Sequence, residues 1–579
     1  MAPPRGGYSA LAYSTKRSQE SDRPSRLGRR DSSSIGQGEA NVLDQIVSSE
    51  RIAAMRQQGH WRDMVLTDFL DRWVAERPEA VAIVDHNSVT GARTELSFRA
   101  LSERVDRLAA GLAGLGVKRG DVVSFQLPNW WQFTALHLAA LRLGAVSNPL
   151  MPIFRERELG FMLGLAESKV LVVPREFRGF DHLAMAERLR PALPTLRHVL
   201  AIGGAGASSF EALLEHDAPL LARVRPDPND VIQLLYTSGT TGEPKGAMHT
   251  SNTLLSNVIP YAERLGLTAR DPVMMASPMA HQTGFMYGLM MAICLGAKSV
   301  LQDIWNADRA ADIIAAEGVA FTMASTPFLS DLDAVAQRRP EAFRSFRIFL
   351  AGGAPIPRVL ARRAAETLGA AIVSGWGMTE NGALAIGKLD DPPEKIFETD
   401  GCPLPGMEIR VVDVDGSTLP PGTEGRLQAR GCSNFVGYYK RPELNGIDAS
   451  GWFDTGDLAR IDADGYVRIT GRSKDIIIRG GENIPVIEIE QLLYKHPAVQ
   501  EVAIVAMPDE RLGERCCAFV VTREGQEFGM EQMRQFLAAE GMTRQYMPER
   551  LEIVPEMPKT PSGKIQKFRL RDIARDLAK

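Results

Sequence analysis

The sequence has few cysteines and no long apolar run. Five cysteines occur in 579 residues, and none has the spacing of a metal site. Adjacent Cys516 and Cys517 are poorly placed to bridge each other. We therefore expect reduced thiols and a cytoplasmic protein. No stretch of about 18 apolar residues occurs, so no membrane-spanning helix is predicted.

The chain also lacks a strong charge of either sign. A formal net charge of -4 provides no field that would attract nucleic acid or an anionic membrane, so neither is expected as a partner. Hydrophobic residues make up 44% and charged residues 24% of the composition, as in soluble globular proteins. A chain of this length is too long for one ordinary core, which predicts two or more domains.

Residues 1–45 differ from the rest of the chain. They are rich in Arg, Ser, Gly and Pro and lack the apolar core of a signal peptide. The acids Glu20, Asp22 and Asp31 argue against an organellar transit peptide. This composition predicts a disordered tail.

From about residue 46 onward, apolar strands alternate with amphipathic helices. Leu101, Val105, Leu108 and Leu112 recur at helical spacing, and "VVSFQL" reads as a buried strand. Such alternation predicts an α/β fold with parallel sheets covered on both faces. Residues 399–470 instead show short strands joined by Gly- and Pro-containing turns, which predicts a small β unit. The remaining chain predicts a small α+β domain.

The stretch "SGTTGEPKG" (238–246) has poor helix and strand propensity and follows the strand-like "VIQLLY". Its glycines allow backbone N–H groups to turn toward a phosphate, its hydroxyls add donors, and Lys245 adds a positive charge. The Walker A pattern does not fit, because Gly246 stands where Ser or Thr is required. A flexible surface hairpin is the alternative interpretation. The candidate phosphate-binding residues are Thr237, Ser238, Gly239, Thr240, Thr241, Gly242 and Lys245.

Four further motifs follow in order: "GWGMTE" (375–380), "FDTGDL" (453–458), "GRSKDIIIRGGENI" (471–484) and "PSGKI" (561–565). With "YTSGTTGEPKG" (236–246), they resemble the signatures of the adenylate-forming superfamily of acyl-CoA synthetases, adenylation domains and luciferases. The resemblance runs from about residue 60 to the end. It is nearest to bacterial medium-chain and cyclohexanecarboxylate-type ligases. It implies a large N-terminal domain (46–473) and a small mobile C-terminal domain (474–579).

The resemblance implies a two-step reaction that uses ATP, Mg²⁺ and coenzyme A. A carboxylate attacks the α-phosphorus of ATP and releases pyrophosphate, and a thiol then displaces AMP from the acyl adenylate. The implied catalytic residues are Lys564, Thr237 and Glu380, with Glu380 as the Mg²⁺ ligand; a helix N-terminal acid is the alternative for Glu380. Lys559 and Lys567 are expected to be nearly silent when mutated.

The resemblance also assigns the nucleotide contacts. Trp376 would stack on adenine, although a core tryptophan is the alternative. Asp457 would accept hydrogen bonds from the ribose hydroxyls, Arg472 would be a second contact to the ribose or a phosphate, and Asp454 would form the turn. A structural turn acid is the alternative for Asp457. The other implied contacts are Gly352, Gly353, Ala354, Pro355, Gly375, Gly377, Met378 and Thr379.

One active site must serve both steps, which the family achieves by rotating its C-terminal domain. Lys474 occupies the family's hinge position; a plain surface lysine is the alternative. Gly480, Gly481 and Glu482 resemble the loop that lines the coenzyme A tunnel, where the absence of Cβ atoms would leave room for the thiol arm.

The acyl pocket is predicted from His281 onward. His281 would gate the site, with a structural histidine as the alternative, and Gln282 replaces the aspartate that amino-acid-activating relatives use to pair an ammonium group. Gly377 replaces the tryptophan that fills the pocket of acetate-specific relatives. We therefore expect an uncharged medium-chain, alicyclic or aryl carboxylic acid. The predicted pocket residues are His281, Thr283, Gly284, Phe285, Ala351 and Gly377.

The sequence ends soon after Lys564 without a carrier-protein domain, so free coenzyme A is the expected acceptor. Two other functions stay open: an adenylation enzyme that loads a carrier protein, and a non-catalytic nucleotide-binding homologue. The expected partners are the acid, ATP and coenzyme A, and a homodimer is left open.

Overall fold

The computed structural model describes most of the chain after residue 46. The described residues are 47–215, 223–237, 244–353, 356–473, 477–479, 482–509, 512–542, 544–560 and 563–578. The predicted disordered tail lies outside them. Among the helices of these ranges, none combines the length and apolar character that crossing a bilayer requires.

The larger of the two main sheets has nine strands within the described residues, with parallel neighbours in its centre and antiparallel pairs at its edges. In spatial order its strands are β17 (Cys402–Pro403), β16 (Gly382–Ile386), β15 (Ala371–Met378), β14 (Ile348–Ala351), β13 (Phe321–Ala324), β11 (Val273–Met275), β12 (Ser299–Gln302), β1 (Val81–His86) and β2 (Arg93–Ser97).

The second main sheet has seven strands in the described part of the chain and is also parallel in its centre. In spatial order its strands are β20 (Gly437–Tyr438), β10 (Lys245–Thr250), β9 (Val231–Thr237), β4 (Val146–Pro149), β3 (Val122–Phe125), β5 (Val170–Pro174) and β8 (His198–Ile202). The edge strand β20 comes from far along the chain and pairs antiparallel with β10.

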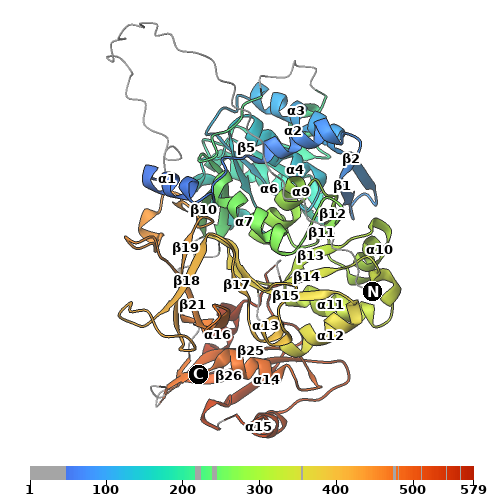
Figure 1. The fold of residues 1–579 in the computed structure, drawn as a ribbon. Coiled ribbons are helices and arrows are strands. Elements are labelled where there is room, and N and C mark those ends of the chain that lie inside the picture. Colours follow the sequence, from blue (N-terminus) through green and yellow to red (C-terminus); the bar gives the residue numbers. More distant parts are fainter. Residues whose placement is uncertain are drawn as a thin grey trace, which may run out of the picture. The chain divides into compact units, whose positions relative to one another are not determined.

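Helices cover both main sheets, so the central strands are buried, whereas the edge strand β2 is largely exposed. Helices α10, α11 and α12 pack against β13, β14 and β15 (Figure 1). The helix α3 buries Leu101, Val105, Leu108 and Leu112, as their spacing predicts. The helices of this part of the chain are α1 (Ser49–Gln57), α2 (Leu66–Glu76), α3 (Phe98–Gly114), α4 (Trp131–Arg142), α5 (Glu156–Leu165), α6 (His182–Leu189), α7 (Ser251–Arg264), α8 (Gln282–Gly284), α9 (Met291–Leu295), α10 (Ala307–Glu317), α11 (Thr326–Ala336), α12 (Arg358–Leu368) and α13 (Pro393–Glu398).

The predicted small β unit is a separate antiparallel sheet. Its strands are β18 (Met407–Val412), β19 (Gly425–Gly431), β21 (Phe453–Ile461) and β22 (Val467–Arg472). The predicted turn between β18 and β19 contains Gly416, whose φ of 87° favours glycine because it has no Cβ. A short hairpin of β6 (Glu176–Phe177) and β7 (Phe180–Asp181) also lies outside the main sheets.

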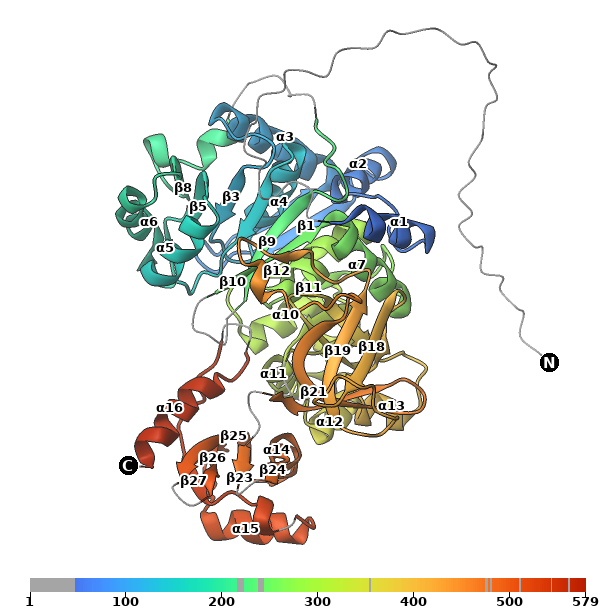
Figure 2. The ribbon, with the colours of Figure 1, turned by 90° about the vertical axis from the view of Figure 1, so that its left-hand side faces the viewer.

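The C-terminal part is an α+β unit with apolar side chains on both faces of its sheet. The strands are β23 (Ile477–Arg479), β24 (Glu482–Ile484), β25 (Val499–Asp509), β26 (Gly513–Thr522) and β27 (Arg550–Ile553). Helices α14 (Val486–Leu493) and α15 (Met530–Ala539) cover one face, and α16 (Lys567–Leu577) covers the other (Figure 2). The predicted fold class is confirmed; the domain limits 46–473 and 474–579 stay predictions.

Candidate active site

The predicted phosphate loop connects the antiparallel strands β9 and β10. Thr237 ends β9 and pairs with Lys245, the first residue of β10, so both lie at the same edge of the second sheet. The predicted phosphate-binding residues in the loop between these two strands lie outside the described residues: Ser238, Gly239, Thr240, Thr241 and Gly242.

Lys245 is held by a tyrosine from β20. Its Nζ donates to the Tyr438 hydroxyl over 3.1 Å and lies 4.2 Å from the centre of the Tyr438 ring. The neighbouring strand pair β10–β20 brings the two residues together. The lysine charge is therefore fixed at the base of the predicted phosphate loop rather than extended into solvent.

The same tyrosine also contacts Glu380. The Tyr438 hydroxyl donates to Glu380 Oε1 over 2.5 Å, and the Phe435 N–H donates to the Glu380 carbonyl over 2.7 Å. Glu380 is 4% exposed. Burial and the Glu380 charge raise the pKa of Tyr438, which keeps its hydroxyl proton in place. Lys245, Tyr438 and Glu380 thus form one chain of hydrogen bonds.

His249 fixes the backbone immediately before Glu380. Its Nε2–H donates to the Thr379 carbonyl over 2.8 Å, and its Nδ1 lies 3.1 Å from Thr253 Oγ1. Because a carbonyl can only accept, Nε2 carries the proton. Burial lowers the pKa of His249 to about 4, so the ring is neutral at pH 7.

Asp457 accepts two bonds from the residues predicted around it. The Trp376 Nε1–H donates to Oδ2 over 2.9 Å, and Arg472 Nε lies 2.8 Å from Oδ1. The pairing of β21 with β22 places Asp457 opposite Arg472. Asp454 accepts the Gly456 N–H over 3.0 Å, as a turn-forming aspartate does.

Trp376 is 9% exposed and packs in an apolar cluster with Trp61 and Leu384. This environment agrees with the alternative interpretation, in which Trp376 is a core residue. Its N–H also donates a hydrogen bond to Asp457. Adenine stacking stays a prediction.

The glycines near the ends of β14 and β15 allow backbones to approach closely. A Cβ on Gly352 would lie 3.0 Å from the Gly375 carbonyl oxygen, and one on Gly377 would lie 1.9 Å from the Gly382 oxygen. Packing against β16 therefore requires glycine at position 377, and its role in leaving the acyl pocket open stays a prediction. Gly353 has a φ of 79°. Ala354 and Pro355 lie outside the described ranges.

His281 precedes the short helix α8 and caps its first turn. Its Nδ1 accepts the Thr283 N–H over 3.3 Å. Desolvation and the positive charge of Lys564 lower the pKa of His281 to about 4. The His281 ring is therefore neutral at pH 7, and the acyl-gate role of His281 and the catalytic role of Lys564 stay predictions.

Asn129 holds the loop that carries His281. Its Nδ2 donates to the Ser277 carbonyl over 2.9 Å, and its Oδ1 accepts the Met279 N–H over 2.8 Å. The His281 N–H in turn donates to the Pro278 carbonyl over 3.0 Å. One buried amide thus orders the loop over three residues.

Three of the predicted acyl-pocket residues are fully enclosed by neighbours. Phe285 is buried, and its ring centre lies 4.7 Å from that of His137. A Cβ on Gly284 would lie 2.3 Å from the Pro278 oxygen, and Ala351 packs among the α10–α12 side chains. Their assignment to the pocket stays a prediction.

Lys564 lies in a tight turn, where its N–H donates to Thr560 Oγ1 over 3.0 Å. The preceding Gly563 has a φ of 80°, and a Cβ there would lie 2.6 Å from Ser325 Oγ at the start of α11. Glycine is needed at 563 both for this conformation and for the close approach.

Lys559 and Lys567 are poor controls for Lys564, contrary to expectation. Lys559 pairs with Glu501 over 2.7 Å, and Lys567 pairs with the buried Glu490 over 2.6 Å. Because each neutralises a carboxylate, their substitution is expected to affect stability.

The predicted hinge and tunnel are described only in part. Lys474, Gly480 and Gly481 lie outside the described residues. Of Glu482 the backbone is described, and it pairs with Arg479 in the β23–β24 hairpin. The hinge and tunnel roles stay predictions.

Residues 70–439 match the family model described as AMP-binding enzyme, and residues 488–564 match that of the AMP-binding enzyme C-terminal domain. The chain belongs to the AMP-binding enzyme family. It is an ATP-dependent, AMP-forming acid–thiol ligase, and such ligases use ATP, Mg²⁺ and coenzyme A.

Two relatives and one solved structure show how similar this AMP-binding enzyme is to known proteins. It is 37% identical over 538 residues to the medium-chain fatty-acid–CoA ligase of Escherichia coli (strain K12), covering 92% of this chain and 94% of that protein. It is 36% identical over 537 residues to a salicylyl-CoA synthase / salicylate adenylyltransferase of Streptomyces, covering 90% and 96%. The anthranilate CoA ligase AuaEII, solved with anthranoyl-AMP, superposes with a TM-score of 0.81 at 26% identity, covering 89% and 98%.

The residues of this AMP-binding enzyme fit a magnesium ion that is bound mainly by phosphate oxygens. Within the described ranges, no group of three or more His, Cys, Asp or Glu side chains could hold a metal. Glu380 offers a buried carboxylate, of which the hydrogen bond from Tyr438 engages one oxygen. Mg²⁺ is commonly held by one or two carboxylates together with substrate phosphates and water, so a single protein carboxylate suits it.

Tyr438, His249 and Asn129 were missed by reasoning from the sequence. Tyr438 lies in "FVGYYK" and His249 in a strand, where neither pattern indicates a site. Asn129 carries a usable signal, since it follows the buried strand β3 at the carboxyl edge of a parallel sheet. Ligands of open α/β sheets bind at that edge.

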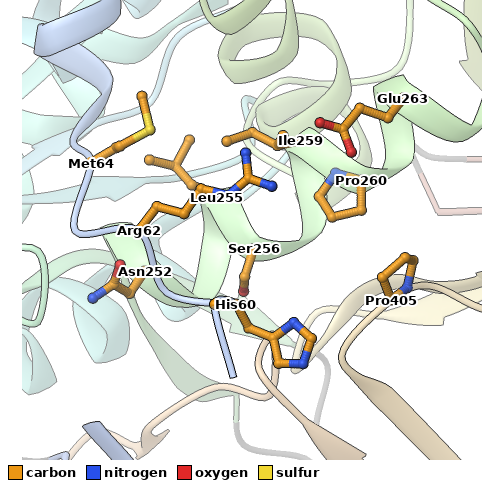
Figure 3. A pocket seen from close by; sticks show the side chains of 11 residues that line it. His60, Arg62, Met64, Asn252, Leu255, Ser256, Ile259, Pro260, Glu263 and Pro405 are labelled. Carbon is orange, nitrogen blue, oxygen red and sulfur yellow. The ribbon is translucent and has the colours of Figure 1, made fainter. Parts of the chain in front are cut away.

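A separate cavity of about 90 Å³ lies between residues 59–64 and helix α7 (Figure 3). Its lining includes Arg62, Asn252 and Glu263 but none of the predicted site residues. Ligand pockets for drug-sized molecules measure roughly 300–1,000 Å³. This cavity is therefore too small for a nucleotide.

Proposed function

We propose that this enzyme ligates an uncharged medium-chain, alicyclic or aryl carboxylic acid to free coenzyme A. The close approach of the Lys564 turn to the start of α11 is the observation that supports it best, since a Cβ on Gly563 would lie 2.6 Å from Ser325 Oγ. The positive charge of Lys564 also contributes to the lowered pKa of His281, the predicted acyl gate. Bringing a carboxylate to the α-phosphate of ATP requires such a charge, because both reactants are anions.

In the proposed first step, a carboxylate oxygen bonds to the α-phosphorus and pyrophosphate leaves. Lys564 would contact the carboxylate and the α-phosphate, and Lys245 and the hydroxyls near it would contact the other phosphates. A magnesium ion bound at Glu380 would supply additional positive charge to the phosphates. In the second step, the thiolate sulfur of coenzyme A bonds to the acyl carbon and AMP leaves.

The buried amides near the gate support an uncharged acyl group. Gln233 Nε2 donates to Gln282 Oε1 over 3.0 Å, and both residues are buried. A neutral amide cannot neutralise an ammonium group, which would be costly to bury unpaired. The named relatives act on a medium-chain fatty acid and on salicylate, which supports an apolar or aryl acid here.

A panel of acids of graded size tests the substrate class. Pyrophosphate release should be fastest with hexanoate, octanoate, cyclohexanecarboxylate or an aryl acid, and slow with acetate and with amino acids. A preference for acetate or for an amino acid would contradict the proposal. Mass spectrometry of the products with added coenzyme A should reveal the acyl-CoA thioester.

Two variants test the catalytic assignment. Lys564→Ala should reduce adenylate formation about a hundredfold or more, the contribution typical of a preorganised electrostatic group. Arg569→Ala, which removes an exposed cation of α16, is the matched control and should have little effect. Adenylate formation in Lys564→Ala within a fewfold of the wild-type rate would contradict the lysine's role.

The runner-up function, loading a carrier protein, shares the first step. An enzyme that releases pyrophosphate with the acid but forms no thioester with coenzyme A would support it. Absence of pyrophosphate release with every acid would instead support the non-catalytic homologue.

We further propose a reducing, cytoplasmic location and a homodimer. Five unpaired cysteines, four of them buried, support the first proposal. Analytical ultracentrifugation tests the second, and a sedimentation coefficient of a monomer would contradict it.

A further inference from the structure

The helix α1 precedes the residues that define the family and contacts a loop next to the active site. Arg51 of α1 donates through Nη2 to the Asn434 carbonyl over 2.5 Å and the Gly431 carbonyl over 3.4 Å, and through Nη1 to the Phe435 carbonyl over 3.3 Å. Burial lowers the pKa of Arg51 to about 10, so it remains charged at pH 7. Its bonds to the carbonyls are charge-assisted.

Trp61 completes this contact. Its Nε1–H donates to the Cys432 carbonyl over 3.0 Å, and the Arg51 guanidinium carbon lies 5.3 Å from the centre of its ring. Together the two side chains satisfy four carbonyls of the loop 431–435. Cys432, Asn434 and Phe435 follow the end of β19 and lie outside the strands, so their carbonyls need such donors.

The other side of the same loop holds Glu380. The Phe435 N–H donates to the Glu380 carbonyl, and Ser433 Oγ donates to the Asn381 carbonyl over 2.9 Å. Three residues after Phe435, the Tyr438 hydroxyl donates to the Glu380 carboxylate. The peptide group between Asn434 and Phe435 therefore accepts a hydrogen bond from Arg51 at its carbonyl and donates one from its N–H to the Glu380 carbonyl.

We propose that Arg51 is a positioning residue for Glu380, acting through the loop 431–438. It touches neither substrate nor metal; it sets where the loop holds the backbone and carboxylate of Glu380. This inference rests on the proposed role of Glu380 as the magnesium ligand. Loss of Arg51 should weaken the use of metal and ATP while leaving the thiol step nearly intact, since the metal is needed for the phosphates.

The test compares Arg51→Ala with Arg56→Ala, a control on the same helix. Arg56 forms a half-exposed ion pair with Asp63 over 2.8 Å and makes none of the loop contacts. In Arg51→Ala, the Mg²⁺ concentration for half-maximal pyrophosphate release should rise about tenfold, the loss expected for one charge-assisted hydrogen bond. Thioester formation from a supplied acyl adenylate should stay within about twofold of wild type.

A binding measurement separates positioning from a loss of activity. The affinity of the enzyme–ATP complex for Mn²⁺, followed by electron paramagnetic resonance, should fall by a similar factor in Arg51→Ala and stay unchanged in Arg56→Ala. Trp61→Phe removes one carbonyl donor of the same loop and should shift Mn²⁺ affinity in the same direction by a smaller factor. If Arg51→Ala does not fold, Trp61→Phe provides the test in its place.

Unchanged Mn²⁺ affinity in the folded Arg51 or Trp61 variant would overturn the inference. Equal losses in the adenylate and thioester steps would also overturn it, since they indicate a general loss of structure. A wild-type enzyme that releases no pyrophosphate with any acid would refute the proposed function instead, while Mn²⁺ binding would still test Arg51.

Discussion

Tyr438 joins two charged residues that are far apart in the sequence. It accepts a hydrogen bond from Lys245 and donates one to Glu380. A tyrosine can do both at once because its hydroxyl is donor and acceptor. At the scale of single residues, the site thus depends on a side chain that carries no charge itself.

Tyr438→Phe should lower kcat/KM for MgATP about tenfold to a hundredfold. The change removes the hydrogen bond that Tyr438 donates to the buried Glu380 carboxylate, at a cost of about 1.5–3 kcal/mol for a hydrogen bond to a charged group. Tyr439→Phe, a change of the adjacent buried tyrosine, is the control. Steady-state pyrophosphate release measures both, and equal kinetics for the two variants would contradict the role of Tyr438.

Trp376→Phe tests whether the indole N–H orients Asp457. Phenylalanine keeps an aromatic ring but loses the N–H that donates to Oδ2. If Asp457 binds the ribose hydroxyls, the variant should lose about tenfold in kcat/KM with ATP and much less with 2′-deoxy-ATP or 3′-deoxy-ATP. An equal loss with all three nucleotides would indicate only a packing defect.

Within the C-terminal unit, one ion pair joins two helices and a strand. Glu490 of α14 is 3% exposed, and its Oε1 accepts from Lys567 of α16 and from the Ile504 N–H of β25, each over 2.6 Å. The pair connects the elements on opposite faces of the sheet. The ion pair therefore contributes to how α14 and α16 pack on the sheet, and this contribution depends on both residues together.

Lys567→Ala should destabilise this unit by about 3 kcal/mol, because it leaves a buried carboxylate unpaired. Hydrogen exchange of α14 and α16, followed by mass spectrometry, should accelerate accordingly. Arg575→Ala is the control, since its pair with Asp572 is exposed and contributes less than about 1 kcal/mol. Exchange that is no faster in Lys567→Ala than in the control would contradict this prediction.

Across the whole molecule, buried histidines make stability depend on pH. The pKa of His137 is lowered to about 3 and those of His182, His249 and His281 to about 4, in each case first by desolvation. Below pH 6.5, these four histidines bind protons in the unfolded chain but stay neutral in the folded protein. Stability is therefore lost as pH falls from about 6.5 toward 4.

Each histidine contributes up to about 1.4 kcal/mol per pH unit in that window. Asp85 opposes them, because burial raises its pKa to about 7 and the folded protein keeps its proton. The four histidines outnumber it, so the thermal midpoint measured by calorimetry should fall between pH 6.5 and 4.5. A midpoint that is constant or rises on acidification would show that these rings are not buried in the neutral form.

The sequence alone determined the family, the order of the motifs and the alternation of strands and helices. The spacing of apolar residues follows the local geometry of a helix or strand, as at Leu101 and Val105 of α3. A glycine-rich loop can likewise be recognised from its composition alone. Glu380, Asp457 and Lys564 could therefore be selected as candidates, and their roles stay predictions.

Only the tertiary structure decided which side chains meet. Tyr438 reaches Glu380 across 58 positions, Trp376 reaches Asp457 across 81, and Arg51 reaches Asn434 across 383. No local pattern encodes such pairs, because strand order and helix packing bring the partners together. Tyr438, His249 and Arg51 therefore could not be recognised from the sequence, whereas Asn129 could, because it follows a buried strand.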